Sequence, residues 1–433
     1  MFTNYQKIFE KKFLIFLIFT IFFLYIYQFF NYNISKQHDV WLHHYYILNI
    51  LKFNFSEITS EYGIFYYFYT ACFSLITYPL YYFQILEERE VFYLTVRLSN
   101  LSLLTITFFI IYKICRDIFN FKYKQITLTI LLCFSFAFFN KTFFMARPEN
   151  LMIPVSLIII LETYKIINNK KITLKIILPS LCILSAQKVS GLIFSLVILA
   201  FLFFKQREKN YYKLILFFTC GLILLYLFHY LISGVKFYQN SDRLFGDATS
   251  LGIIHNFDKF NVLYKFSLID AWKNPLRDFQ NYSLINILSL ELIGDYWKYG
   301  VFNNIKFNLN ESCLIILNRI SIIYFIIFLI LIISLIIHFF NLEKKFSKSE
   351  NSITLMMFIL MFAGIGVIIL AVFFRANFDD LDIVKYEYIS YFIIPIIFVI
   401  VKFSAETPKY NILIYTLIGL GLYNNLLPIH CLT

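Results

Sequence analysis

Long apolar runs alternate with short polar segments along the whole chain. Each run holds about 15 to 28 residues, the length that crosses the hydrocarbon core of a bilayer as a helix. Eleven runs fit, near residues 13–30, 93–114, 126–144, 149–167, 172–186, 189–204, 211–232, 313–340, 352–374, 388–403 and 410–428. The pattern therefore predicts an all-α polytopic membrane protein with about 11 transmembrane helices and extracytoplasmic interfacial helices.

The segment 62–83 is also apolar, and the charges of the loops decide whether it crosses the membrane. If it does not cross, the Lys- and Arg-rich loops all fall on one side, which the positive-inside rule assigns to the cytoplasm. The linker that follows, "QILEERE", is net acidic, as suits an outer loop. We therefore predict that 62–83 is an interfacial helix, rich in the Tyr and Phe side chains that favour the headgroup region.

This topology divides the chain into three parts. Residues 1–232 form an N-terminal transmembrane module that includes a first outer loop at 31–61 and the interfacial helix 62–83. Residues 233–312 form an extracytoplasmic loop or lid, and residues 313–433 form the C-terminal transmembrane helices. The first apolar run has no small-residue cleavage site after it, so we expect a retained anchor with a cytoplasmic N-terminus.

Composition excludes several classes of protein. The 433 residues are 60% hydrophobic and 15% charged, which is outside the range of ordinary soluble domains. The net charge of +12 comes from residues spread through the loops, so we expect no nucleic-acid partner. The seven cysteines lie mostly in apolar runs without CxxC spacing, which favours buried free thiols over a disulfide framework or a zinc site.

The stretch "SKQHDVWLHHYY" in the first outer loop carries the first candidate chemistry. Asp39 is the only acid between Glu10 and Glu57, and a carboxylate held there could act as a general base toward a hydroxyl acceptor. The alternative is a solvated loop aspartate. His38, His43 and His44 could bind a metal, but hydrogen-bonding or interfacial roles are the more common use of such residues.

Two further outer turns place cations near the membrane surface. In "RPE", Arg147 has the fork of donors that binds phosphate, or it pairs with Glu149 and caps the following helix. Lys188 separates two apolar runs that are short for a full span. It either enters an outward-facing cavity formed by broken helices or snorkels at a simple hairpin.

The outer segment "RANFDDLDIVKYEY" carries the remaining candidates. Asp379, Asp380 and Asp382 would suit a divalent cation, although adjacent loop acids are usually solvated. Lys385 and Tyr386 could contact a lipid phosphate and a sugar ring. We assign no metal ligand and leave a divalent cation as a possible cofactor.

Taken together, the order of these motifs resembles the GT-C superfamily of integral-membrane glycosyltransferases, particularly dolichyl-phosphate-mannose protein mannosyltransferases and lipid A aminoarabinose transferases. The matching stretches are "HDVWLHHYYILNILKFNF", "SEYGIFYYFYTACFSLI", "VRLSNLSLLTITFFIIYKICRDIF", "ARPENLMIPVSLIIILE", "LSAQKVSGLIFSL" and "VKYEYISYFIIPII". The N-terminal half matches closely and the C-terminal half loosely.

The resemblance implies an inverting transfer of a sugar from a polyprenyl-phosphate donor to a lipid, glycan or protein acceptor on the extracytoplasmic face. Asp39 matches the general base, and Arg147, Lys188 and Lys385 fall where such enzymes bind the donor phosphate. His38, His43, Glu149 and Tyr386 would contact the acceptor or support the residues that do. A bacterial inner (plasma) membrane is the expected location, with membrane lipids around the protein.

Three alternatives remain open at this point: a non-catalytic scaffold subunit, in which Asp39 would be dispensable, and two active membrane proteins. One is an O-antigen-type polymerase or ligase, which also has many spans and a large outer loop. The other is a polytopic transporter or flippase, although most polar residues are predicted to lie on one face and not at mid-membrane depth.

Overall fold

The computed structural model is built from helices. It describes residues 40–55, 63–168, 174–205, 209–233, 267–276, 283–294, 311–342, 348–375 and 389–426, with scattered residues between 8 and 30, and these contain no strand. The α-helices are α2 (Val40–Leu51), α3 (Phe65–Tyr82), α4 (Glu88–Asp117), α5 (Tyr123–Ser135), α6 (Ala137–Phe144), α7 (Glu149–Ile167), α8 (Leu174–Gln187), α9 (Val189–Lys205), α10 (Lys209–Ser233), α13 (Leu268–Lys273), α14 (Leu284–Glu291), α15 (Glu311–Leu342), α16 (Lys348–Arg375), α17 (Ser390–Glu406) and α18 (Asn411–Leu426).

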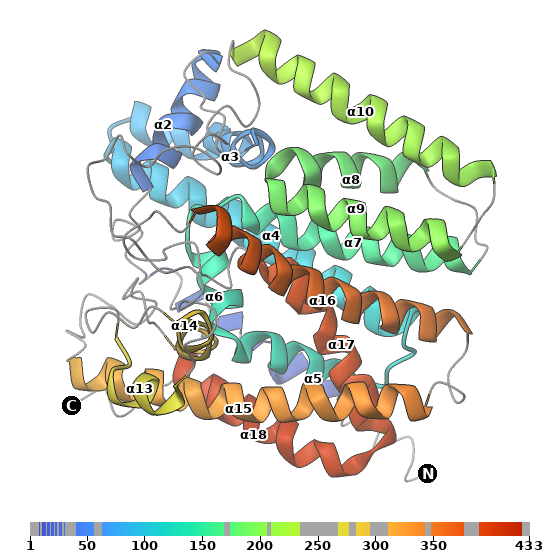
Figure 1. The fold of residues 1–433 in the computed structure, drawn as a ribbon. Coiled ribbons are helices and arrows are strands. Elements are labelled where there is room, and N and C mark those ends of the chain that lie inside the picture. The colour runs from blue at the N-terminus through green and yellow to red at the C-terminus, as the bar shows by residue number, and fades with distance from the viewer. Residues whose placement is uncertain are drawn as a thin grey trace.

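The longest helices run side by side along a common direction (Figure 1). In the part of the chain that the structure describes, five helices are long and apolar enough to cross a membrane, within α4, α7, α10, α15 and α16. The bent pair α5 and α6 would make a sixth span. The protein is therefore an all-α membrane protein, and the larger count of about 11 spans stays a prediction.

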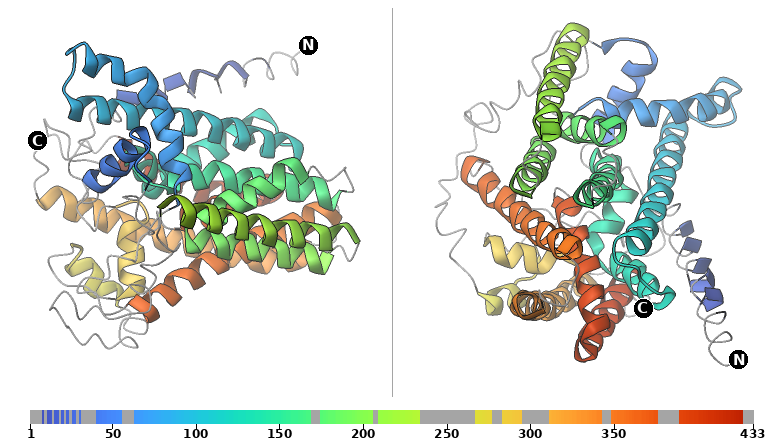
Figure 2. Two further views of the ribbon diagram at one scale, coloured as in Figure 1. Left: turned by 90° about the horizontal axis from the view of Figure 1, so that it is seen from above. Right: turned by 90° about the vertical axis from the view of Figure 1, so that its right-hand side faces the viewer.

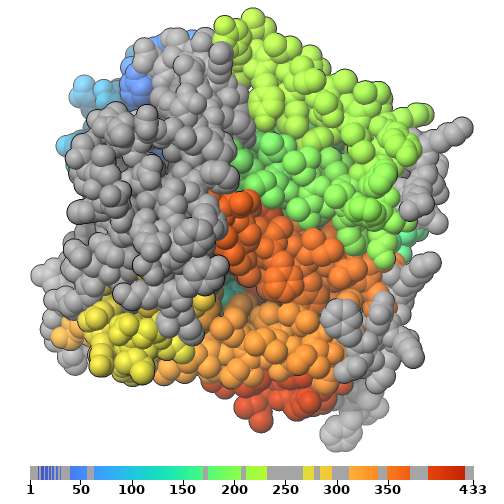
Figure 3. Space-filling view, in the orientation of Figure 1, coloured from blue at the N-terminus to red at the C-terminus, as the bar shows by residue number. Residues whose placement is uncertain are grey.

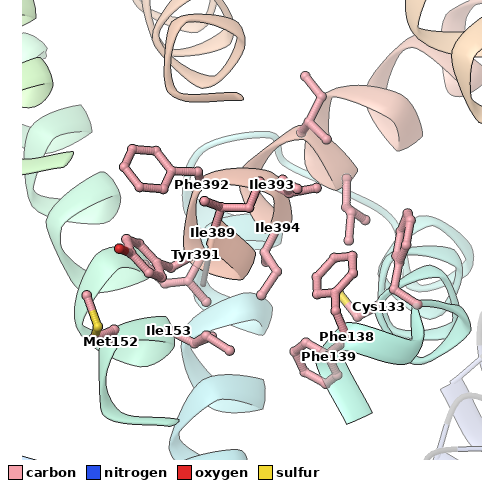
Figure 4. Close-up of a cluster of buried hydrophobic side chains, with 14 of the residues drawn as sticks. Cys133, Phe138, Phe139, Met152, Ile153, Ile389, Tyr391, Phe392, Ile393 and Ile394 are labelled. Carbon is pink, nitrogen blue, oxygen red and sulfur yellow. The ribbon is translucent and has the colours of Figure 1, made fainter. Parts of the chain in front are cut away.

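Helix α17 lies at the centre of this bundle. Its sequence is apolar all round, and nearly all of its residues are buried, which is the behaviour expected of a core helix. Figure 4 shows Tyr391 to Ile394 between Met152 and Ile153 of α7 on one side and Cys133, Phe138 and Phe139 of α5 and α6 on the other. The core thus joins segments from both halves of the chain.

The predicted span 126–144 is broken in two. Helices α5 and α6 meet at Phe136, whose backbone is extended, and their axes differ by 70°. The break is compensated within the protein, because the Asn140 amide donates to the Phe134 carbonyl at 2.9 Å and the Ala137 N–H donates to the Leu292 carbonyl at 3.2 Å. Such compensation is required wherever backbone leaves helical geometry at membrane depth.

Helix α14, from the predicted outer lid, packs into this bend and ends in a buried ion pair. Lys141 Nζ of α6 lies 2.6 Å from Glu291 Oε1 and also donates to the Gly294 carbonyl at 2.9 Å. The side chains of Lys141 and Glu291 are 0% and 1% exposed. Helix α14 is therefore anchored in the bundle by a desolvated contact.

The first predicted outer loop, 31–61, contains a helix that the hydrophobic pattern does not predict. Helix α2 buries one face, which includes Val40, His43 and Tyr46, against α3. Helix α3 is viewed nearly end-on in Figure 1 and lengthwise in the right-hand view of Figure 2, so it lies across the bundle direction. It is not among the candidate spans, and the interfacial assignment of 62–83 stays a prediction.

The two ends of the bundle differ in chemistry. We use the term site end for the end where α2 lies and where α7 begins, close to His43, Arg147 and Lys188 (Figure 1). The helix termini near Lys165, Lys175, Lys205 and Lys209 lie at the opposite end. One flank between these ends is formed by α10, α9, α16 and α15 (Figure 3), and α10 exposes most of its apolar side chains.

The cysteines correct one expectation. Cys115, Cys133 and Cys182 are buried free thiols as predicted, but Cys72 and Cys220 are exposed. Cys313, near the start of α15, is disulfide-bonded. The sequence alone does not predict this bond, because cysteine spacing does not specify disulfide pairing.

Candidate functional site

The turn that carries Arg147 is held by two asparagines. Asn100 of α4 donates to the Phe143 and Met145 carbonyls at 3.0 and 2.8 Å, and Asn150 donates to the Met145 carbonyl at 2.8 Å. Pro148 occupies the position just before α7, where its missing N–H costs no helical hydrogen bond. Arg147 therefore sits on a rigid turn at the site end of α7.

Tyr66 extends this support from α3. Its hydroxyl donates to the Asn100 amide oxygen at 3.2 Å, and burial raises the pKa of the phenol well above its ordinary value. The phenol is therefore neutral at any physiological pH. Its role is to link α3 to the Arg147 turn as a hydrogen-bond donor.

The junction between α8 and α9 places Lys188. The Gly63 N–H donates to the Gln187 carbonyl at 2.9 Å, and the Gln187 side chain donates back to the Gly63 carbonyl at 2.6 Å. A Cβ at Gly63 would overlap the Ala186 carbonyl oxygen, so only glycine permits this approach. The chain just before α3 thus fixes the backbone on which Lys188 is mounted.

Lys188, at the α8–α9 junction, and Glu149, at the start of α7, form an ion pair. Lys188 Nζ lies 2.5 Å from Glu149 Oε1, and the two side chains are 20% and 1% exposed. A lysine that only snorkels from a hairpin would point its ammonium group into water. Lys188 instead forms an ion pair with a buried carboxylate. It also retains partial access to solvent, which Glu149 does not.

His43 of α2 lies beside these charges. Its Nδ1 shares a hydrogen bond of 2.8 Å with the Tyr67 hydroxyl, and its side chain is buried. Burial and the positive charges of Arg147 and Lys188 lower the pKa of His43 to about 3, against the opposing effect of Glu149. His43 is therefore neutral at physiological pH and can accept or donate a hydrogen bond without carrying charge.

The electrostatic balance of this cluster favours an anionic ligand. Arg147 and Lys188 supply two positive charges, Glu149 supplies one negative charge, and His43 is neutral, so the four residues leave one positive charge. In a partly desolvated environment that charge interacts more strongly with an anion than it would in water. We refer to Arg147, Lys188, Glu149 and His43 as the cation cluster.

The structure brings together four of the eight residues predicted for the site. Arg147, Lys188, Glu149 and His43 come from α2, the α7 start and the α8–α9 junction. Asp39, His38, Lys385 and Tyr386 lie outside the described residues, as do Asp379, Asp380 and Asp382. No group of three or more metal-ligating side chains occurs within the described part of the chain.

Sequence reasoning missed the residues that position the cluster. Tyr66 and Tyr67 belong to the aromatic run "FYYFY", in which nothing distinguishes two hydrogen-bonding tyrosines from their neighbours. Asn100 is a single amide side chain within a long apolar helix. This position could have marked it in the sequence, since a polar side chain in a transmembrane helix needs a hydrogen-bond partner. It finds one in the Arg147 turn.

No protein-family model, curated protein or solved structure matches the chain.

Proposed function

We propose that the protein is a membrane glycosyltransferase that transfers a sugar from a polyprenyl-phosphate donor to an acceptor on the extracytoplasmic face. The observation that carries this proposal is the cation cluster, in which Arg147 and Lys188 are gathered at one end of a membrane bundle with one counter-charge. A polyprenyl-phosphate sugar is a phosphodiester with a single negative charge. Its lipid tail would keep that charge at headgroup depth.

The chemistry assigned to the cluster is stabilisation of the leaving group. As the acceptor hydroxyl attacks the anomeric carbon, the bond from that carbon to the phosphate oxygen breaks, and the phosphate leaves with the electron pair. Arg147 can offer paired donors to phosphate oxygens, and Lys188 adds a point charge. The proton of the attacking hydroxyl is assigned to Asp39 as general base.

Glu149 and His43 have supporting roles in this proposal. Glu149 holds Lys188 in place before the donor binds, because its buried carboxylate has the lysine as its ion-pair partner. His43 and Tyr67 offer neutral hydrogen-bonding groups on the α2 side of the cluster, as suits contact with sugar or acceptor hydroxyls. A neutral His43 would not compete with the cations for the phosphate.

The test is reconstitution of the full chain with a panel of polyprenyl-phosphate sugars and mass spectrometry of lipid, glycan and protein acceptors. The double variant Lys188→Met/Glu149→Gln removes both charges together and so avoids a buried unpaired carboxylate. We expect the donor concentration for half-maximal transfer to rise roughly tenfold to a hundredfold, from loss of charged hydrogen bonds. The control Lys402→Met removes a lysine that also pairs with glutamates, Glu350 and Glu406, and should change nothing.

A second variant tests the base. Asp39→Asn should abolish transfer at unchanged protein level in the membrane while photo-crosslinking of the donor persists. Undiminished transfer would remove Asp39 from the mechanism, and an unchanged donor dependence in the Lys188→Met/Glu149→Gln variant would remove Lys188 from donor binding.

A transporter or flippase is the second candidate, because the break between α5 and α6 and the buried Lys141 are features found in transport proteins. Movement of labelled lipid across proteoliposomes without any covalent product would favour it. A ladder of glycan lengths among the products would instead indicate an O-antigen-type polymerase.

A further inference from the structure

The buried Lys141–Glu291 pair and the Arg147 turn are joined through one residue. The Lys141 ammonium group donates to Glu291 Oε1 at 2.6 Å and to the Gly294 carbonyl at 2.9 Å. The carbonyl of the same Lys141 accepts a hydrogen bond of 3.2 Å from the Met145 N–H, and Arg147 follows two residues later. Lys141 therefore contacts both the end of α14 and the start of the turn that carries Arg147.

The end of α14 is itself held by two other helices. The Ile293 N–H donates to the Ser321 hydroxyl of α15 at 3.1 Å, and that hydroxyl donates to the Ser289 carbonyl at 2.8 Å. Asn424 of α18 donates to the Ile293 carbonyl at 2.8 Å. Buried groups paired in this way are costly to move, because a displacement would leave a desolvated donor or acceptor without a partner. The carboxylate at the end of α14 is therefore presented from a fixed frame.

Helix α6 is held at both ends, and α14 contributes to its direction. Two asparagines, of α4 and α7, both donate to the Met145 carbonyl at 2.8 Å, at the end of α6. At its start, the Ala137 N–H donates to the Leu292 carbonyl at 3.2 Å. Lys141 adds a side-chain contact one helical turn later. The segment 291–294 thus contacts α6 at two points, which together set the direction of the helix that leads to the turn.

Stability alone does not account for this buried pair. Replacing a buried ion pair with apolar side chains of similar volume is often neutral or stabilising, so a bundle gains little net free energy from keeping one. A charged pair with a further hydrogen bond does fix the distance and orientation of two elements more narrowly than apolar contact. Helix α6 needs such a contact because its axis is turned by 70° from that of α5, so no continuous helix holds it in line.

We propose that Lys141 and Glu291 position Arg147 for the phosphate of the donor, through α6 and the turn that follows it. This proposal rests on the proposed function, in which Arg147 binds that phosphate. The pair does not touch the donor, because its side chains are 0% and 1% exposed. An arginine fork matches phosphate only in a defined orientation, and a shift of about 1 Å in a binding group can cost about a hundredfold in rate.

The test compares the natural protein with Lys141→Met/Glu291→Leu in the reconstituted full chain. We expect the donor concentration for half-maximal transfer to rise roughly threefold to tenfold, with the corresponding acceptor concentration unchanged. The control Lys165→Met/Glu162→Leu removes a pair near the opposite end of α7, whose glutamate is also buried, and should leave the donor dependence unchanged. An unchanged donor dependence in the Lys141→Met/Glu291→Leu variant would overturn the proposal.

A double-mutant cycle tests whether the effect passes through Arg147. In an Arg147→Met background, the donor concentration for half-maximal photo-crosslinking should be the same with and without Lys141→Met/Glu291→Leu. A general structural loss would weaken donor binding by the same factor in both backgrounds. That result would exclude positioning through Arg147.

Two further measurements separate failure of the pair from failure of the proposed function. If the double variant does not accumulate, Glu291→Asp keeps the charge and shortens the side chain, and it should raise the donor concentration roughly twofold; no rise would overturn the proposal. If the natural protein transfers no sugar, the proposed function fails, and amide hydrogen exchange decides about the pair. Exchange at residues 143–147 should be roughly threefold faster in the variant, and equal exchange would show that the pair does not hold the turn.

Discussion

Two lysine–glutamate pairs near the site end differ in their access to water, and that difference separates their roles. Lys141 and Glu291 are 0% and 1% exposed, whereas Lys188 is 20% exposed beside a buried Glu149. A fully desolvated pair cannot exchange its partner for a ligand without opening the protein. Lys188 can meet an incoming anion, which is why we assign it, and not Lys141, to the donor phosphate.

Removing one member of the desolvated pair should destabilise the fold strongly. Glu291→Gln leaves the Lys141 ammonium group buried without its counter-charge, so we expect a loss of about 3–5 kcal/mol in the free energy of unfolding. Thermal unfolding in detergent would show this as a lowered Tm. Lys141→Met/Glu291→Leu should recover most of the loss, and Glu350→Gln, in a partly exposed pair, should cost less than about 1 kcal/mol.

His43 should make stability depend on pH. Its folded-state pKa of about 3 lies below the ordinary value of 6.5, so the unfolded state binds a proton first as the pH falls. Its contribution is fully retained above pH 6.5 and is lost progressively as the pH falls from 6.5 toward 3, by about 2 kcal/mol at pH 5.

The measurement is a series of detergent unfolding curves from pH 8 to pH 5. Between pH 8 and pH 5, the free energy of unfolding of His43→Gln should fall less than that of the natural protein, by about 2 kcal/mol. Parallel curves for the two proteins would show that His43 is protonated in the folded state or that its burial is incomplete.

At the scale of elements, hydrophobic periodicity predicts where helices lie but not where they break. The predicted spans 149–167 and 189–204 match α7 and α9 within a few residues. The break at Phe136 carries no glycine or proline, and its stability comes from Asn140 and from the Leu292 carbonyl, over 150 residues away in sequence. Likewise, the pairing of Lys188 with Glu149 depends on how α7, α8 and α9 pack, which no local pattern specifies.

The contact between Gly63 and the α8–α9 junction should control activity through Lys188. Gly63→Ala places a methyl group against the Ala186 carbonyl, so the junction must shift, and we expect the donor concentration for half-maximal transfer to rise at least fivefold. Gly366→Ala is the matched control, because a Cβ there meets nothing within 4 Å. Equal kinetics for both variants would contradict a positioning role of this contact.

At the scale of the whole molecule, the charge distribution predicts an orientation in the membrane without any knowledge of the packing, and that orientation stays a prediction. The structure adds that the lysine-bearing helix termini gather at one end and the cation cluster at the other. It does not extend to Asp39 or Lys385, so the assembly of the complete proposed site stays a prediction. The sequence could name those residues because their motifs are local, whereas the packing of the helix bundle depends on contacts between distant segments.

The orientation can be measured directly. In a Cys72→Ser/Cys220→Ser background, a cysteine at Trp272 should react with a membrane-impermeant maleimide in intact cells. A cysteine at Lys205 should react only after permeabilisation, because the two positions are expected on opposite faces. The reverse pattern would invert the topology and place the cation cluster in the cytoplasm.

The central position of α17 has a consequence for biosynthesis. Residues 390–406 leave the ribosome only after most of the other helices have been made, yet their side chains fill the space between α7, α5 and α6. At about 5–20 residues per second, the earlier helices wait in the membrane for tens of seconds without their core. Final packing is therefore a late event, and a chain arrested before Ser390 would present an open apolar groove to the insertion and quality-control machinery.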